Sequence, residues 1–151
     1  MDPTNSAFSD SFGPPHPDNP YLQRAISKTN AHCEGIWDNL ERVATLEPAA
    51  AHAIVAEFLE LACLAQHMGN IQIGRYGIGA LPRAWVLANI EDVAEPMLAT
   101  GGEWVYRRLL EVYQYLDLGL TRKLALRATA DADGDIRECG RDFLDSASSP
   151  P

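Results

Sequence analysis

Three side chains that could bind a metal ion, Glu60, Cys63 and His67, are spaced three and four residues apart in a stretch with helical periodicity. This spacing places them on one side of a helix, and zinc accepts carboxylate, thiolate and imidazole ligands. A structural zinc site needs a fourth ligand and usually a pair of cysteines, which this stretch lacks. Cys63 also lies beside the apolar stripe of the same helix, where a free cysteine is mostly a small hydrophobic residue. We therefore predict no metal site. A metal-dependent or thiol enzyme built on these three residues is the least favoured hypothesis.

An acidic turn, Asp131-Ala-Asp-Gly-Asp135, offers some of the oxygen ligands of a calcium-binding loop. Such a loop requires glycine at its sixth position and a bidentate glutamate at its twelfth. Ile136 and Asp142 occupy those positions here. The turn is explained without an ion if Asp135 caps a final helix and Glu138, three residues later, completes a capping box. The sequence therefore predicts a helix cap in place of a calcium site.

Two further patterns have the residue types of an active site in the wrong arrangement. His32 and Cys33 are adjacent, and adjacent helical residues point about 100° apart, so the imidazole does not face the thiol. The glycines of residues 74–79 are in the wrong order for a dinucleotide fingerprint, and no Lys-Ser or Lys-Thr pair of a phosphate loop follows them. No serine has the context of a nucleophile elbow, and the carboxylates are dispersed. We predict that the protein is not an enzyme and binds no cofactor.

The composition indicates a single folded domain. A chain of 151 residues with 46% hydrophobic content can bury a core. No run approaches the roughly 18 apolar residues of a membrane helix, and the N-terminus lacks the basic and apolar regions of a secretory signal. Three isolated cysteines make no disulfide framework. These features predict a cytoplasmic protein that does not bind a membrane.

The charge balance indicates what kind of partner the protein could bind. Twelve basic and 21 acidic side chains give a net charge of −9. Nucleic acid is excluded as a partner because binding to its backbone needs lysine and arginine to displace counterions. A basic protein would be attracted and its association accelerated. The alternative is that the acidity only confers solubility.

The apolar pattern predicts an all-α fold. Residues 1–19 and 146–151 are rich in Pro, Ser, Asn and Asp and are predicted to be flexible tails. Phe8 and Phe12 could dock on the domain, although a lone aromatic residue in a tail usually does not, and the sequence leaves this open. Residues 20–145 form one domain of about seven helices, with no strand. These helices are expected at residues 20–46 with a bend or split at Gly35, at 48–68 with Gly69 and Asn70 as the stop, at 71–80 as a closely packed helix, at 82–100 with a kink or end at Pro96, at 103–116, at 118–128, and from 135 onward. The short links between them favour stacked antiparallel hairpins, as an α-solenoid or a bundle.

Three segments carry a resemblance to a known family: Leu81-Pro-Arg-Ala-Trp85, Glu103-Trp-Val-Tyr-Arg-Arg-Leu-Leu-Glu111 and Asp135-Ile-Arg-Glu138. They resemble the HEAT-like helical repeats of small bacterial proteins, including immunity-type proteins encoded beside secreted toxins. The resemblance covers residues 71–145 and implies stacked helical hairpins that present a surface to a partner. The same helical-repeat architecture also occurs in scaffolds and in DNA-repair enzymes. The DNA-repair enzymes need a cationic concave face, which this chain lacks.

Two functions follow from these observations. The first is an acidic protein-binding module of the immunity-protein kind, which binds and occludes a basic toxin or nuclease domain. The second is a scaffold or self-associating protein, such as a homo-oligomer, with no toxin partner. Trp104 and Tyr115 project away from the apolar stripe of their helix, so they either pack internally or contact the partner. The candidate contact residues are Glu91, Asp92, Glu95, Glu103, Trp104, Arg108, Glu111, Tyr115 and Asp117.

Overall fold

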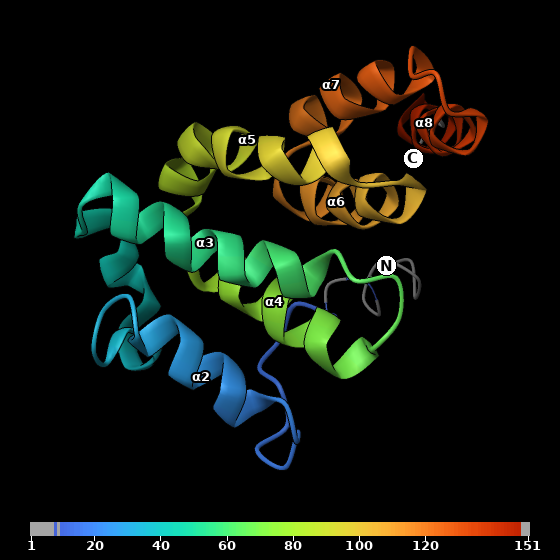
Figure 1. Ribbon diagram of the computed structural model, residues 1–151. Coiled ribbons are helices and arrows are strands. Elements are labelled where there is room, and N and C mark those ends of the chain that lie inside the picture. Colours follow the sequence, from blue (N-terminus) through green and yellow to red (C-terminus); the bar gives the residue numbers. More distant parts are fainter. Residues whose placement is uncertain (1–7, 9, 149–151) are drawn as a thin grey trace.

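The fold is all-α, as predicted, with one element more than expected (Figure 1). The computed structural model describes residue 8 and residues 10–148, and within them no strand occurs. Within the described residues eight helical elements follow one another: α2 (Leu22–Asn30), the 3-10 helix η1 (Ile36–Thr45), α3 (Pro48–Ala62), α4 (Met68–Ala80), α5 (Arg83–Thr100), α6 (Glu103–Leu116), α7 (Leu118–Thr129) and α8 (Gly134–Ser148). In this part of the chain no helix is long and apolar enough to cross a membrane.

The additional element arises because the first predicted helix is split at Gly35. Gly35 has a left-handed backbone with φ of 73°, which glycine adopts without steric cost. The chain turns there and continues as η1, whose Ile36, Leu40 and Val43 are buried. Pro48 then begins α3 at its first turn, where its missing amide hydrogen costs nothing.

The boundary between α3 and α4 was predicted wrongly. Helix α3 ends at Ala62 and does not continue to Met68, and Gly69 and Asn70 lie inside α4 and do not stop a helix. His67 has a left-handed backbone with φ of 73° directly before α4, and this turn brings α4 back against α3. Met68 is consequently 61% exposed, although the periodicity placed it on the buried face.

The closely packed helix predicted over residues 71–80 is confirmed as part of α4. A Cβ atom at Gly74 would lie 2.4 Å from the carbonyl oxygen of Phe58 and from the backbone nitrogen of Ala62. At Gly77 it would lie 2.4 Å from the phenyl ring of Phe58. The glycines that weaken the helical pattern therefore allow α4 to approach α3 more closely than any larger residue would permit.

Helix α5 passes through Pro96 and reaches Thr100, so of the two predicted outcomes, a kink or an end, the end does not occur. A proline inside a helix removes one amide donor and leaves the carbonyl four residues earlier without its usual partner. That carbonyl belongs to Asp92, which is exposed, so water can bind it. Val93 before the proline and Leu98 after it are both buried, so packing stabilises α5 on both sides of Pro96.

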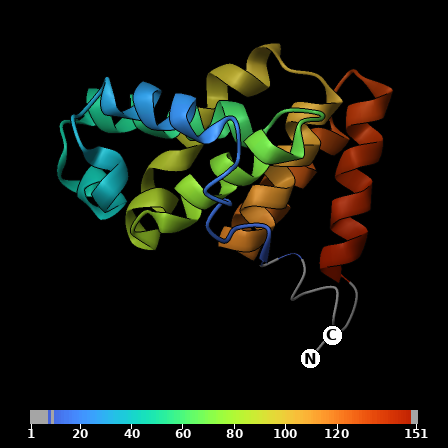
Figure 2. The same cartoon turned by 90° about the horizontal axis from the view of Figure 1, so that it is seen from below.

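Helix α6 lies at the centre of the C-terminal half and packs against α3, α5, α7 and α8 (Figures 1 and 2). The apolar spacing predicts a buried stripe of Val105, Leu109, Val112 and Leu116, widened by Tyr106, Leu110 and Tyr113. All of these except Val105 are buried. The cap of α8 differs from the prediction. The carboxylate of Asp133, not Asp135, accepts hydrogen bonds from the amides of Asp135 (2.8 Å) and Ile136 (3.4 Å). The helix therefore begins one residue before Asp135, and Glu138 is not in the capping-box position.

The predicted N-terminal tail docks at Phe12. This side chain is 5% exposed and stacks on Tyr115, with ring centroids 3.9 Å apart and an interplanar angle of 6°. Phe8 contacts Phe12 edge-to-face at 5.7 Å. The question that the sequence left open is therefore answered: these aromatic residues dock, because α6 offers Phe12 a matching ring. At the other end, residues 146–148 belong to α8 and not to a tail. The remaining residues of the two predicted tails, 1–7, 9 and 149–151, lie outside the described residues.

Candidate binding surface around α6

Glu111 on α6 is the centre of an ion-pair network that connects three parts of the fold. Its carboxylate accepts hydrogen bonds from the Arg75 guanidinium of α4 and from Nη1 of Arg108 at 3.1 Å. Arg108 also donates to the carbonyl oxygens of Leu64 (3.1 Å) and Ala65 (2.9 Å) in the α3–α4 turn. Arg108 and Glu111 are two of the predicted contact residues. Their side chains are only 15% and 22% exposed and bind other parts of this chain.

Arg75 is a residue of this candidate site that the sequence analysis did not identify. It is 5% exposed, its Nη1 donates to the hydroxyl of Ser11 at 2.8 Å, and its guanidinium carbon lies 5.2 Å from the Phe12 ring centroid. Within the described chain its Nε is the one buried side-chain nitrogen or oxygen atom without a hydrogen-bond partner. Burial lowers the pKa of Arg75, and the charge of Glu111 opposes this effect. The sequence did contain a signal for this site: Arg75 is a charged residue between isoleucines in a glycine-rich helix.

Trp104 and Tyr115 of α6, which were predicted either to pack internally or to contact a partner, have different environments. Tyr115 is 40% exposed, but one face of its ring is covered by Phe12. Trp104 is 46% exposed, and the guanidinium of Arg108 lies 5.4 Å from its ring centroid. Because Arg108 is held by two carbonyl oxygens and by Glu111, the indole lies beside a fixed group. Trp104 is therefore an exposed aromatic side chain with a defined position.

Most of the predicted contact acids form ion pairs within the chain. Glu91 pairs with Lys123 at 2.7 Å, and Glu95 pairs with Arg127 at 2.7 Å. The hydrogen bond from Arg127 lowers the pKa of Glu95. Asp117 caps α7 through the amide of Leu120 and lies 3.6 Å from Arg83. In the described residues only two of the predicted acids, Asp92 and Glu103, have no ion pair. The α5 face is thus largely neutralised by cations of α7.

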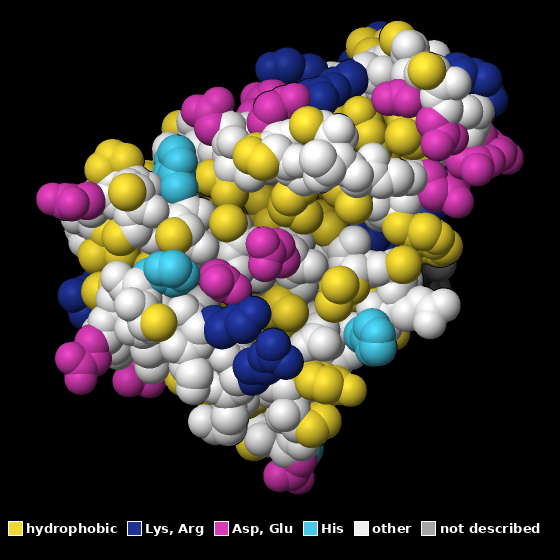
Figure 3. Space-filling view, viewed as in Figure 1, with side chains coloured by type: hydrophobic (Ala, Val, Ile, Leu, Met, Phe, Trp, Pro, Cys, Tyr) yellow, Lys and Arg dark blue, Asp and Glu magenta, His cyan; other side chains and the backbone are white. Residues whose placement is uncertain are grey.

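The surplus of negative charge is greater at the end of the molecule formed by the α7–α8 loop and α8, hereafter the acidic end (Figure 3). Residues 131–145 contain six acidic side chains and two arginines, which leaves a net charge of −4. One of these arginines, Arg137, donates to the carbonyl oxygens of Asp131 (2.9 Å) and Ala132 (2.8 Å) and so serves the loop. The sequence predicted the acidity of this segment but did not assign partner contacts to it.

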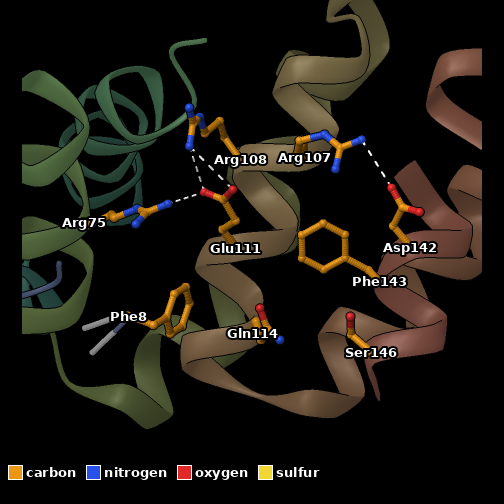
Figure 4. A pocket seen from close by; sticks show the side chains of 9 residues that line it. All are labelled: Phe8, Arg75, Arg107, Arg108, Glu111, Gln114, Asp142, Phe143 and Ser146. Carbon is orange, nitrogen blue, oxygen red and sulfur yellow. Dashed lines mark hydrogen bonds and ion pairs between the residues drawn. The ribbon is translucent and has the colours of Figure 1, made fainter. Parts of the chain in front are cut away.

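A groove runs along α6 beside this network, with a volume of about 470 Å³ (Figure 4). Its floor is formed by side chains spaced along one face of α6. Helix α8 provides one wall, and α4 with the N-terminal segment provides the opposite wall. Its lining residues are Phe8, Arg75, Arg107, Arg108, Glu111, Gln114, Asp142, Phe143 and Ser146. Arg107 lies 3.6 Å from the carboxylate of Asp142 across the groove edge.

The residues first considered for metal or thiol chemistry are not brought together. Because α3 ends at Ala62, Glu60, Cys63 and His67 do not share a helix face. Cys63 is buried, and burial raises the pKa of its thiol to about 12, so it is protonated at neutral pH. The ring of His32 lies 3.6 Å from Glu57, away from a nucleophile–base pairing with Cys33. Among residues 8 and 10–148, no group of three or more His, Cys, Asp and Glu side chains could hold a metal ion.

Comparison with known proteins does not supplement this geometry: no protein family, no curated protein and no solved structure matches the chain.

Proposed function

We propose that this chain is an acidic protein-binding module whose partner is a cationic protein. The specific role we favour is that of an immunity protein, which binds a basic toxin or nuclease domain and covers the residues that contact its substrate. The observation that carries the proposal is Trp104, an exposed indole on α6 positioned beside the fixed guanidinium of Arg108.

The physical case rests on how protein interfaces obtain their affinity. Tryptophan and arginine are enriched among the few residues that supply most of the binding free energy. A side chain that is already positioned loses less conformational entropy on binding, and ordering a free side chain costs about 0.5–1.5 kcal/mol. Trp104 is 46% exposed, so its contact area is available without any rearrangement of the core.

Charge supplies the preference for a basic partner. The net charge is −9, and the acidic end contributes −4 of it. A cationic protein would be steered toward this end, and its association rate would fall as salt screens the attraction. The stacked HEAT-like hairpins implied by the resemblance belong to the same proposal, as does a reducing cytoplasmic compartment, in which the three cysteines stay free.

Replacing Trp104 with alanine should remove this binding while leaving the fold intact. We expect the wild-type protein to retain a cationic protein from a lysate of its own host, and W104A to retain at least about tenfold less, as for an interface anchor. Raising the salt concentration should release the partner. The matched control is L126A, which removes a side chain that is 50% exposed on α7. Recovery of no cationic protein, or binding that neither salt nor W104A weakens, would contradict the proposal.

The alternative is a scaffold or self-associating protein. It is favoured by Leu118 and Leu126 of α7, which are 65% and 50% exposed and give this helix an apolar outer surface. Light scattering separates the two functions. A stable oligomer that dissociates when both leucines are replaced by serine supports the scaffold, whereas a monomer in both proteins supports the binding module.

A further inference from the structure

We propose that the groove along α6 is a binding site for a small organic anion with a planar apolar body, such as an aromatic carboxylate. This site is separate from the protein-binding surface, because Trp104 does not line the groove. The inference rests on three features of the groove: its charge, one adjustable arginine and its two aromatic walls.

The groove carries positive charge inside an acidic protein. Two guanidinium groups that line it, Arg75 from the α4 wall and Arg108 from the α6 floor, share the single carboxylate of Glu111. This cluster therefore has a net charge of +1, and the Arg107–Asp142 pair at the edge adds none. Arg75 is 5% exposed, so water screens its charge poorly. A buried guanidinium whose Nε has no acceptor also leaves hydrogen-bonding capacity unused beside the cavity. A monoanion in the groove would neutralise the cluster, and a cation would be repelled.

Arg107 is the residue that can bind the anion directly. Its Nη2 lies 3.6 Å from the carboxylate of Asp142, which is longer than a normal hydrogen bond. The Arg107 and Asp142 side chains are 29% and 55% exposed, so both can move at little cost. The planar guanidinium of Arg107 matches a carboxylate with two parallel hydrogen bonds. An incoming carboxylate would therefore replace Asp142 as the partner of Arg107.

The walls favour an apolar body of limited size. Phe8 and Phe143 lie on opposite sides of the groove, and Gln114 and Ser146 lie at its lower end in the view of Figure 4. Aromatic rings stack on a planar group, and the amide and hydroxyl offer neutral hydrogen-bond donors. A volume of about 470 Å³ is within the range of small-molecule sites. Charge and walls together select an anion that carries an aromatic ring.

Calorimetric titration with three probes tests the proposal. The second and third probes each differ from the first in one property. 2-Naphthoate has both the ring and the negative charge, 2-naphthylmethylammonium has the same ring with the opposite charge, and acetate has the charge without the ring. We expect 2-naphthoate to bind with a Kd of about 1 mM or below, and each of the other two to bind at least about tenfold more weakly.

The variants then locate the binding. R107Q should weaken 2-naphthoate binding about tenfold, and R107K should lie between R107Q and the wild type because it keeps the charge without the fork. F143A should also weaken binding, whereas R122Q, on the exposed face of α7, and W104A should not. Circular dichroism checks that each variant is folded. Equal binding of the two naphthyl probes, no saturable binding of 2-naphthoate up to about 10 mM, or unchanged affinity in R107Q would each overturn the proposal.

Discussion

Replacing Glu111 with glutamine is expected to lower the free energy of unfolding by about 3 kcal/mol, at the low end of the range for breaking a buried ion pair. The substitution keeps the shape of the side chain but removes the negative charge that Arg75 and Arg108 share. Arg75 is buried and would be left as an uncompensated cation in a poorly solvated site. The loss of stability is expected at the low end of that range because the Glu111 side chain is 22% exposed, so water can partly replace its carboxylate.

Urea denaturation of the two proteins measures this difference directly. The matched control is E138Q on α8, where the same change is made at an exposed glutamate and should alter stability by less than about 0.5 kcal/mol. If E111Q were as stable as E138Q, the network around Glu111 would not contribute to holding α4, α6 and the α3–α4 turn together.

Replacing Gly74 with alanine should destabilise the protein by about 3 kcal/mol or more, at the upper end of what overpacking costs. The added Cβ atom would lie 2.4 Å from the carbonyl oxygen of Phe58 and from the backbone nitrogen of Ala62. Backbone atoms cannot rotate away as a flexible side chain can, so α3 and α4 must separate. The separation would loosen the contacts of the buried Phe58 and Ile78 at the centre of the core.

Gly79 provides the control in the same helix. A Cβ atom there would meet its nearest atom, in the Tyr115 ring, at an ordinary contact distance of 3.5 Å. G79A should therefore stabilise the protein by about 0.5–1 kcal/mol, because alanine favours the helix and restricts the unfolded chain. Thermal unfolding of both variants tests the pair. Equal melting temperatures for G74A and G79A would show that α3 and α4 are not packed at this distance.

The features predicted well from the sequence are those controlled by local interactions. Gly35 splits a helix because glycine adopts the left-handed backbone of that corner without steric cost, and Pro48 starts α3 because its ring fits a first helical turn. The apolar stripe of α6 is buried as its spacing indicated. These conclusions need only the residues of one helix and its ends.

The incorrect predictions concern contacts between distant segments. The predicted helix ran on to Met68 because the apolar spacing of α3 continues into α4. The spacing alone does not show that the chain folds back between the two helices. Glu111 resembled a solvated acid because its partner Arg75 lies 36 positions away. Tyr115 and Trp104 look alike within α6, and only the docking of Phe12 distinguishes them. Such pairings depend on tertiary packing, which a pattern along one helix does not contain.

Helix α8 packs chiefly on α7 and α6, whereas α3 contacts α2, η1, α4, α5 and α6. In a chain whose elements stack largely on their neighbours, the terminal element is held by fewer contacts and can open without unfolding the rest. Amide hydrogen exchange should therefore report a lower opening free energy for α8 than for α3. The groove along α6 has one wall on α8 and the other on α4. Opening of α8 would remove the α8 wall and leave the ion pairs of Glu111 intact. Opening of α8 would therefore weaken the binding of any ligand in the groove.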